Sequence, residues 1–197
     1  MVRLSIDELI ARLNAALQKR RPDFYKCLQP GLTNAQILSL EEKVGVTLPD
    51  DFKKFYAWKN GQNIEAGRFV ANYDFMDVNG IIYTVEMMNH MTQGGEFDRA
   101  NWWNIGWIPF LYNGGGDSVC LDLAGSFNGE IGQIIEFWHA SADRDITHQS
   151  FYKWLETLVL AMESGVLPYD DNDDYYDEFK VLEAKNNPGY PIENIAK

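Results

Sequence analysis

The chain has 197 residues, of which 46% are hydrophobic and 14% aromatic, a composition that excludes a disordered chain and suits one folded domain. Its formal net charge of -12 argues against a protein that grips nucleic-acid phosphates, because such proteins bind through Lys and Arg. The same charge is compatible with simple solubility or with a basic partner.

The N-terminal residues predict an amphipathic helix. Ser5 and Glu8 have the spacing of a capping box, and the helix should end near Arg20, just before a proline. Its apolar residues recur at helical spacing: Ile6, Leu9, Ile10, Leu13 and Leu17. Acids within this stretch, and the lack of a small-residue cleavage site, favour a helix over a signal peptide.

Two further helices are predicted before residue 62. Thr33 and Gln36 repeat the capping-box spacing, and Gly45 is a natural end for the helix that follows. The next helix is expected to start at Pro49, which has no amide hydrogen to leave unpaired in the first turn. The pair Asn60-Gly61 should close it.

In the middle of the chain the spacing of apolar residues changes from that of helices to that of strands. Segments 68–77, 80–85, 118–123 and 133–139 are short, rich in branched and aromatic residues, and separated by turn residues, so we expect antiparallel strands. A short helix from Thr84 to about Gln93 is expected between them.

The clearest helix follows these strands. Ser150 is its predicted cap, and Gly165 should end it. No repeat or linker divides the molecule, so the pattern predicts a single α+β domain over residues 1–165, with helices packed on one side of a sheet. Residues 166–197 are expected to form an acidic extension that packs on this domain or trails from it.

The stretch WIPFLYNGGGDSVCLD, residues 107–122, resembles a phosphate cradle at first sight. A phosphate-binding glycine loop opens a helix, whereas these glycines lead into an alternating strand and no lysine follows. The alternation puts Val119, Leu121 and Leu123 on one face and Ser118, Cys120 and Asp122 on the other. We therefore interpret the glycines as a turn that needs positive φ angles, held by hydrogen bonds from nearby backbone amides to Asp117.

Other groups of reactive side chains give little indication of a catalytic or metal site. Asp117 and Asp122 should fall on opposite faces of a strand, which does not suit a catalytic carboxylate pair. His139, Asp143 and His148 lack the rigid helical spacing of a metal site, and Cys27 and Cys120 form neither a zinc motif nor a disulfide framework. An enzyme would need Asp117, Asp122 and His139 to converge in a deep pocket.

The general expectation is a soluble, cytoplasmic protein without a catalytic site, metal or other cofactor. No apolar run approaches the length of a membrane span, so no membrane partner is expected. The net charge of -12 argues against a nucleic-acid partner. The segment from Asp170 to Glu178 holds six acids in nine residues but lacks the spacing of a calcium loop. It should be a solvated surface or an acidic tail that touches a basic partner.

Two blocks of sequence, residues 37–61 and 107–155, resemble the SUKH superfamily in their order and spacing. This superfamily includes the fungal cell-wall assembly regulator and many bacterial immunity proteins. The matching residues of the first block are Glu41, Gly45, Leu48, Pro49, Phe52, Asn60 and Gly61. Those of the second block are Trp107, Pro109, Gly116, Asp117, Leu121, Asp122, Gly132, Ser150 and Phe151.

The resemblance implies a central, mostly antiparallel sheet flanked by helices, and a protein-binding role without catalysis. The leading hypothesis is a bacterial immunity protein that neutralises a cognate toxin, such as a nuclease or deaminase domain. The alternative is a regulatory or scaffold protein of the cell-wall assembly regulator type. The motif residues should be structural, so the partner is expected on other surface residues: Asp170, Asp171, Asp173, Asp174, Tyr175 and Tyr176.

Overall fold

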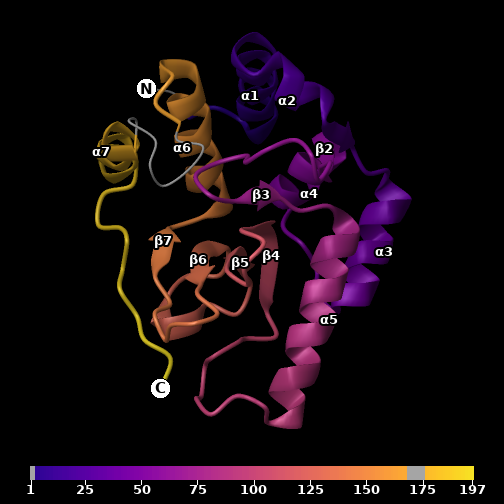
Figure 1. Ribbon diagram of the computed structural model, residues 1–197, viewed down its shortest axis with the longest axis vertical. Coiled ribbons are helices and arrows are strands. Elements are labelled where there is room, and N and C mark those ends of the chain that lie inside the picture. Colours follow the sequence, from indigo (N-terminus) through magenta and orange to yellow (C-terminus); the bar gives the residue numbers. More distant parts are fainter. Residues whose placement is uncertain (1–2, 168–175) are drawn as a thin grey trace.

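The computed structural model describes residues 3–167 and 176–197 (Figure 1). Its described helices are α1 Ile6–Arg20, α2 Pro22–Lys26, α3 Asn34–Val44, α4 Asp50–Trp58, α5 Val78–Gly94, α6 Phe151–Ser164 and α7 Tyr176–Asn186. Its described strands are β1 Leu28–Pro30, β2 Lys59–Gln62, β3 Asp74–Phe75, β4 Trp107–Tyr112, β5 Ser118–Asp122, β6 Gln133–Phe137 and β7 Ile146–His148.

The sheets confirm the α+β prediction. Strands β3 to β7 form one five-stranded sheet in chain order, and each neighbouring pair is antiparallel. Strands β1 and β2 form a separate antiparallel pair. In Figure 1 the helices α1, α2 and α6 lie above the five-stranded sheet, while α5 runs down beside β4.

The predicted helix caps are confirmed where the signals are local. Both halves of the capping box are formed by Ser5 with Glu8 at α1 and by Thr33 with Gln36 at α3. The side chain of Ser150 caps α6 by accepting a hydrogen bond from the Lys153 amide at 3.2 Å. The glycines that follow α3 and α6 are left-handed, as expected of helix C-caps.

The third predicted helix is shifted. Pro49 is the residue before α4 and has extended backbone angles, so the helix begins at Asp50. The pair Asn60-Gly61 does not close a helix but lies within β2. Lys59, the residue after α4, is already extended because β2 pairs with β1 from that residue onward.

The strand prediction for residues 80–85 is wrong. These residues form the first half of α5, whose N-cap Asp77 accepts a hydrogen bond from the Gly80 amide at 2.8 Å. Ile81, Val85 and Met88 are buried on one side of this helix, so the apolar period is helical rather than alternating. The predicted helix from Thr84 to Gln93 is therefore the continuation of the same element.

Strand β4 was not predicted. It pairs with β5 from Trp107↔Asp122 to Tyr112↔Ser118, with an irregular register between Pro109 and Leu111. A proline cannot donate to a strand ladder, and strands accommodate it at bulges of this kind. The short β7, which was also not predicted, pairs with β6.

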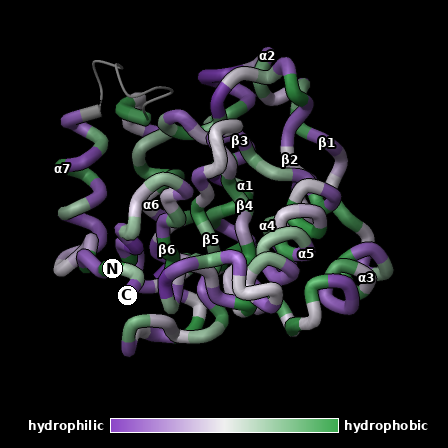
Figure 2. The backbone as a smooth tube through the Cα atoms, turned by 60° about the horizontal axis from the view of Figure 1, so that its bottom comes forward, coloured by the Kyte–Doolittle hydropathy of each residue, from purple (hydrophilic) through white to green (hydrophobic). Residues whose placement is uncertain are grey.

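The main core lies on one face of the sheet. Phe110 from β4 contacts Phe151 and Trp154 from α6, with ring centroids 5.7 and 4.8 Å apart. Phe52 from α4 joins them, 5.2 Å from Phe151. Helix α1 packs along α6, so its buried stripe belongs to the same core. In Figure 2 the colour along α7 changes between hydrophilic and hydrophobic. Phe179 of this helix is buried, whereas Val181 is exposed.

The opposite face of the sheet is also covered. A second cluster comprises Met88, Trp103, Trp107, Cys120, Ile135 and Phe137. The alternation predicted for β5 is therefore right about the two faces, but even its more polar face is buried. Beside this cluster, the fully buried guanidinium of Arg144 lies 4.6 Å from the Trp102 ring and 4.5 Å from the Phe137 ring.

The C-terminal residues run back along the sheet edge. Arg144 donates its amide hydrogen to the Asn194 carbonyl at 2.8 Å, and Ile146 exchanges two backbone hydrogen bonds with Ile192. Helix α7 packs on α6. None of the helices in the described ranges is both long and apolar enough to cross a membrane.

Candidate functional site

The glycine loop is a tight turn between β4 and β5. Gly114 and Gly116 have φ angles of 82° and 112°, which confirms the prediction of positive φ. Asn113 organises the loop, because its Oδ1 accepts hydrogen bonds from the amides of Gly115 at 2.7 Å and Asp117 at 3.1 Å. The prediction that Asp117 holds these amides is therefore wrong, since Asn113 provides the local acceptor.

Asp117 instead connects the loop to the chain beyond β6. Its Oδ1 accepts a hydrogen bond from the His139 amide at 2.9 Å, and its Oδ2 accepts one from the Asn113 side chain at 2.7 Å. The His139 ring is 53% exposed, whereas the Asp117 carboxylate is 12% exposed. Burial alone would raise the pKa of Asp117, but the hydrogen bonds from His139 and Asn113 outweigh it and lower that pKa.

Asp122 organises the other end of β5. Its side chain is buried and accepts hydrogen bonds from the amides of Ala124 and Ser126 and from the Gln133 side chain, all at 2.7 to 2.8 Å. The Ser126 hydroxyl accepts a hydrogen bond from the indole of Trp107 at 2.9 Å. Asp117 and Asp122 thus lie at opposite ends of one strand, each within its own turn.

Gly132 links this turn to the last core helix. Its φ is 92°, and its carbonyl accepts a hydrogen bond from the Phe151 amide at 3.0 Å. Phe151 is the first residue of α6. Within the second sequence block, residues 107–155, this hydrogen bond therefore joins the start of α6 to the residue just before β6.

The first block positions α3, α4 and α5. Glu41 on α3 accepts a hydrogen bond from the Leu48 amide at 2.7 Å and forms an ion pair with Lys53 at 2.9 Å. The hydrogen bond from Lys53 lowers the pKa of Glu41. Asn60 accepts a hydrogen bond from the Val78 amide at 2.9 Å, at the start of α5. A Cβ atom on Gly61 would lie 2.4 Å from the Asp77 nitrogen, so only glycine allows this approach.

The possible ligand set of His139, Asp143 and His148 is not assembled. Asp143 is hydrogen-bonded to Ser141 at 2.6 Å, and His148 is 3% exposed beneath α7, where burial lowers its pKa to about 3. Across the part of the chain that the structure describes, no group of three His, Cys, Asp or Glu residues could hold a metal ion.

The surface predicted to bind a partner lies mostly outside the described residues. This applies to Asp170, Asp171, Asp173, Asp174 and Tyr175. Tyr176 is the first residue of α7. The structure therefore leaves the proposed role of these residues as a prediction.

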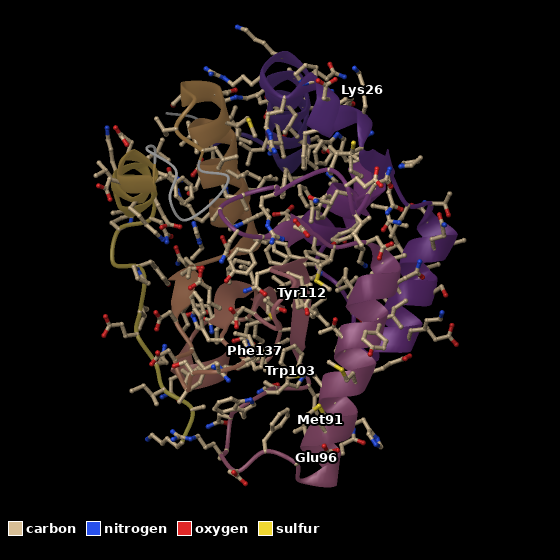
Figure 3. All side chains as sticks on the ribbon, viewed as in Figure 1. Lys26, Met91, Glu96, Trp103, Tyr112 and Phe137 are labelled. Atoms are coloured by element: carbon tan, nitrogen blue, oxygen red, sulfur yellow. The ribbon has the colours of Figure 1, made fainter. Side chains whose placement is uncertain are left out.

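The structure reveals a pocket that sequence reasoning missed. It has a volume of about 220 Å³ and lies between α5 and the end of the sheet that carries the glycine loop. Figure 3 labels Tyr112, Phe137 and Trp103, three residues of its wall, between the sheet and the lower part of α5. Its lining residues come from α5, from the segment before β4, and from strands β4 to β6, so no local sequence pattern marks it.

Comparison with known proteins assigns the family. A family model described as the SMI1 / KNR4 family (SUKH-1) matches residues 31–157. "KNR4/SMI1 homolog 2" of Debaryomyces hansenii is 24% identical over 86% of this chain and 37% of its own length. "Cell wall biosynthesis/cell cycle regulator smi1" of Schizosaccharomyces pombe is 23% identical over 85% of this chain and 38% of its own length.

The matched region contains every residue of the two sequence blocks, from Glu41 in α3 to Phe151 in α6. The chain spans less than two fifths of the length of these two relatives. Because the family model covers more than half of the chain, the resemblance drawn from the two blocks is confirmed, and the chain belongs to the SMI1 / KNR4 family (SUKH-1).

Proposed function

We propose that this chain is a non-catalytic domain that binds another protein and thereby regulates it. The observation that carries the proposal is membership of the SMI1 / KNR4 family, since one relative is named a cell wall biosynthesis and cell cycle regulator. Of the two roles considered, the regulatory one is therefore favoured. In it the chain acts like a cell-wall regulator and has cellular proteins as partners.

The placement of the family motif supports a structural rather than catalytic use of its polar residues. Asp117 and Asp122 each accept hydrogen bonds from backbone amides of nearby turns, and Asn60 does so at the start of α5. Groups that satisfy buried amides in this way stabilise the framework and are not free to transfer protons. The residues that bind the partner are then expected on the exposed surface, outside the family motif.

A second candidate is an immunity protein that neutralises a toxin domain. The formal charge of -12 favours it, because an acidic surface steers a basic nuclease or deaminase domain into contact. The charge speeds such an encounter more than it determines affinity.

Co-purification of the tagged chain from its own cells tests the proposal. We expect a specific partner that rebinds the purified chain at a defined stoichiometry. Deletion of the gene should change resistance to wall-damaging agents if the role is regulatory. If the chain is an immunity protein, the partner should be a toxin encoded beside it, and co-expression should restore growth. Failure to recover any partner that rebinds, together with turnover of a small substrate, would overturn the proposal.

A further inference from the structure

The pocket beside α5 is open and almost wholly apolar. Its deeper wall is formed by buried residues: Met76, Met88, Trp103 and Phe137. At its mouth lie Tyr83 and Met87, which remain 68% and 40% exposed although they are large and apolar. Four positions apart on one helix, they face the same direction and form a continuous apolar rim.

The glycine loop forms part of the same pocket. Gly116 lines it, and a Cβ atom there would lie 2.7 Å from Cγ of His139. The hydrogen bonds of Asp117 to His139 hold the loop and the ring together, so this side of the pocket is preformed. A preformed site is favourable for binding because little conformational entropy is lost there.

The pocket has room for one large side chain. A cavity of roughly 150 Å³ is enough to hold a benzene ring. At about 220 Å³, this pocket therefore accommodates a Leu, Met or Phe side chain. Methionines in its wall and rim adapt their shape readily, which suits recognition of such an anchor.

The part of the chain that builds the pocket carries most of the net negative charge. Residues 69–143 contain every residue of the pocket, and they hold ten Asp or Glu but one Lys or Arg. Their net charge is -9, whereas the rest of the chain, with nineteen acids and sixteen cations, carries -3. Five of these ten acids are exposed, Glu86, Glu96, Asp98, Glu130 and Asp143, and we call them the acidic surface. Asp117 and Asp122 are buried and do not belong to it. Glu86 lies one turn after Tyr83 on α5.

We propose that the pocket binds a basic segment of a partner protein, which inserts one large apolar side chain between α5 and the glycine loop. The inference rests on the proposed function and adds to it the binding face and the chemistry of the partner. Lys or Arg residues of the segment complement the acidic surface. A second copy of this chain is disfavoured as the occupant, because it would bring a like-charged face into contact.

Selection from a random peptide library on the immobilised full chain tests the proposal. We expect enriched peptides with a large apolar residue among Lys or Arg residues. Met87→Lys should weaken a selected peptide by at least about tenfold, as should Ala in place of its apolar anchor. The matched control is Val181→Lys on α7, also an exposed apolar residue, which should change affinity by less than about twofold.

Glu86→Lys provides a second variant that leaves the apolar rim intact. It should weaken the same peptide and reduce the dependence of its affinity on salt. The site is overturned if no peptide is enriched, if the enriched peptides are acidic or lack an anchor, or if Met87→Lys binds like wild type. Self-association of the chain that Met87→Lys abolishes would also overturn it in favour of a dimer.

The natural partner separates this inference from the proposed function. A co-purified partner that binds wild type and Met87→Lys equally overturns the pocket but leaves the binding function in place. A partner whose affinity falls with Met87→Lys and not with Val181→Lys supports both.

Discussion

The Oδ1 atom of Asp117 lies 2.9 Å from the backbone nitrogen of His139 and 2.8 Å from its ring Nδ1. One carboxylate oxygen thus joins the glycine loop to the residue two positions after β6. Because the loop forms a wall of the apolar pocket, this contact also maintains the shape of the pocket.

Asp117→Ala should lower the free energy of unfolding by about 1–3 kcal/mol, because the amide of His139 and the side chain of Asn113 lose their acceptor. Urea denaturation at neutral pH measures the change. Asp143→Ala is the control, since that carboxylate is exposed and bonds to Ser141. Equal losses in the two variants would show that the Asp117 contact contributes nothing particular.

Gly116→Ala should destabilise the protein by roughly 1–3 kcal/mol, because its φ of 112° strains a Cβ atom that also meets the His139 ring. Gly115→Ala is the matched control, since the nearest atom to its Cβ, Asn113 Oδ1, is 3.4 Å away. Thermal unfolding compares the two. A melting temperature for Gly116→Ala that equals that of Gly115→Ala would contradict the structural role.

Arg144→Lys should destabilise the protein by about 3 kcal/mol, although the formal charge is kept. The guanidinium donates hydrogen bonds to the carbonyl oxygens of Trp102, Trp138 and Ser141. The single ammonium group of a lysine cannot reach all three oxygens. Burial lowers the pKa of Arg144 to about 10. Denaturation followed by tryptophan fluorescence provides the measurement, and the exposed Arg99→Lys provides the control. Equal denaturation midpoints for Arg144→Lys and Arg99→Lys would show that the hydrogen bonds of the buried guanidinium do not stabilise the protein.

Glu136 and His148 lie around a cavity of about 130 Å³ beneath α7 and should give opposite pH dependences. Burial raises the pKa of Glu136 from 4.5 to about 7, so its stabilising contribution decreases as pH rises through this range. Burial lowers the pKa of His148 from 6.5 to about 3, so its contribution increases as pH rises from 3 to 6.5.

Glu136→Gln separates the two effects. Relative to wild type, the variant should gain up to about 1.4 kcal/mol of stability per pH unit between the two pKa values of the glutamate. Urea titrations at several pH values across that range measure the difference. Parallel stability curves for the two proteins would show that Glu136 titrates normally.

The helices with caps could be predicted because their signals are local. Ser5 and Thr33 each satisfy an amide three residues away, so the sequence alone specifies where α1 and α3 begin. The start of α5 was predicted wrongly because its signals are only partly local. Asn79-Gly80 has the composition of a turn, but Asp77 caps a helix there and Asn60, far away in sequence, accepts the Val78 amide.

The candidate site was only half visible in the sequence. The positive φ angles of the glycine loop followed from GGGD, whereas the partner of Asp117 is a residue twenty-two positions later. The pocket combines Tyr83 and Met87 of α5 with Trp103 and Phe137 from later parts of the chain, so no local spacing could indicate it. The buried Arg144 is similar, since the Trp102 carbonyl that it binds belongs to a residue forty-two positions earlier in the chain.

The sequence by itself determined the family, the α+β class, the ends of α1, α3 and α6, and the acidic charge. The class, the helix ends and the charge depend on residue type and on spacing within one or two turns, and the family depends on the order of two motif blocks along the chain. The tertiary structure decided that residues 80–85 are helical, that both faces of the sheet are buried, and that an apolar pocket opens in the acidic part of the molecule. These features depend on contacts between segments distant in the chain, which outweigh local preference because they bury apolar surface.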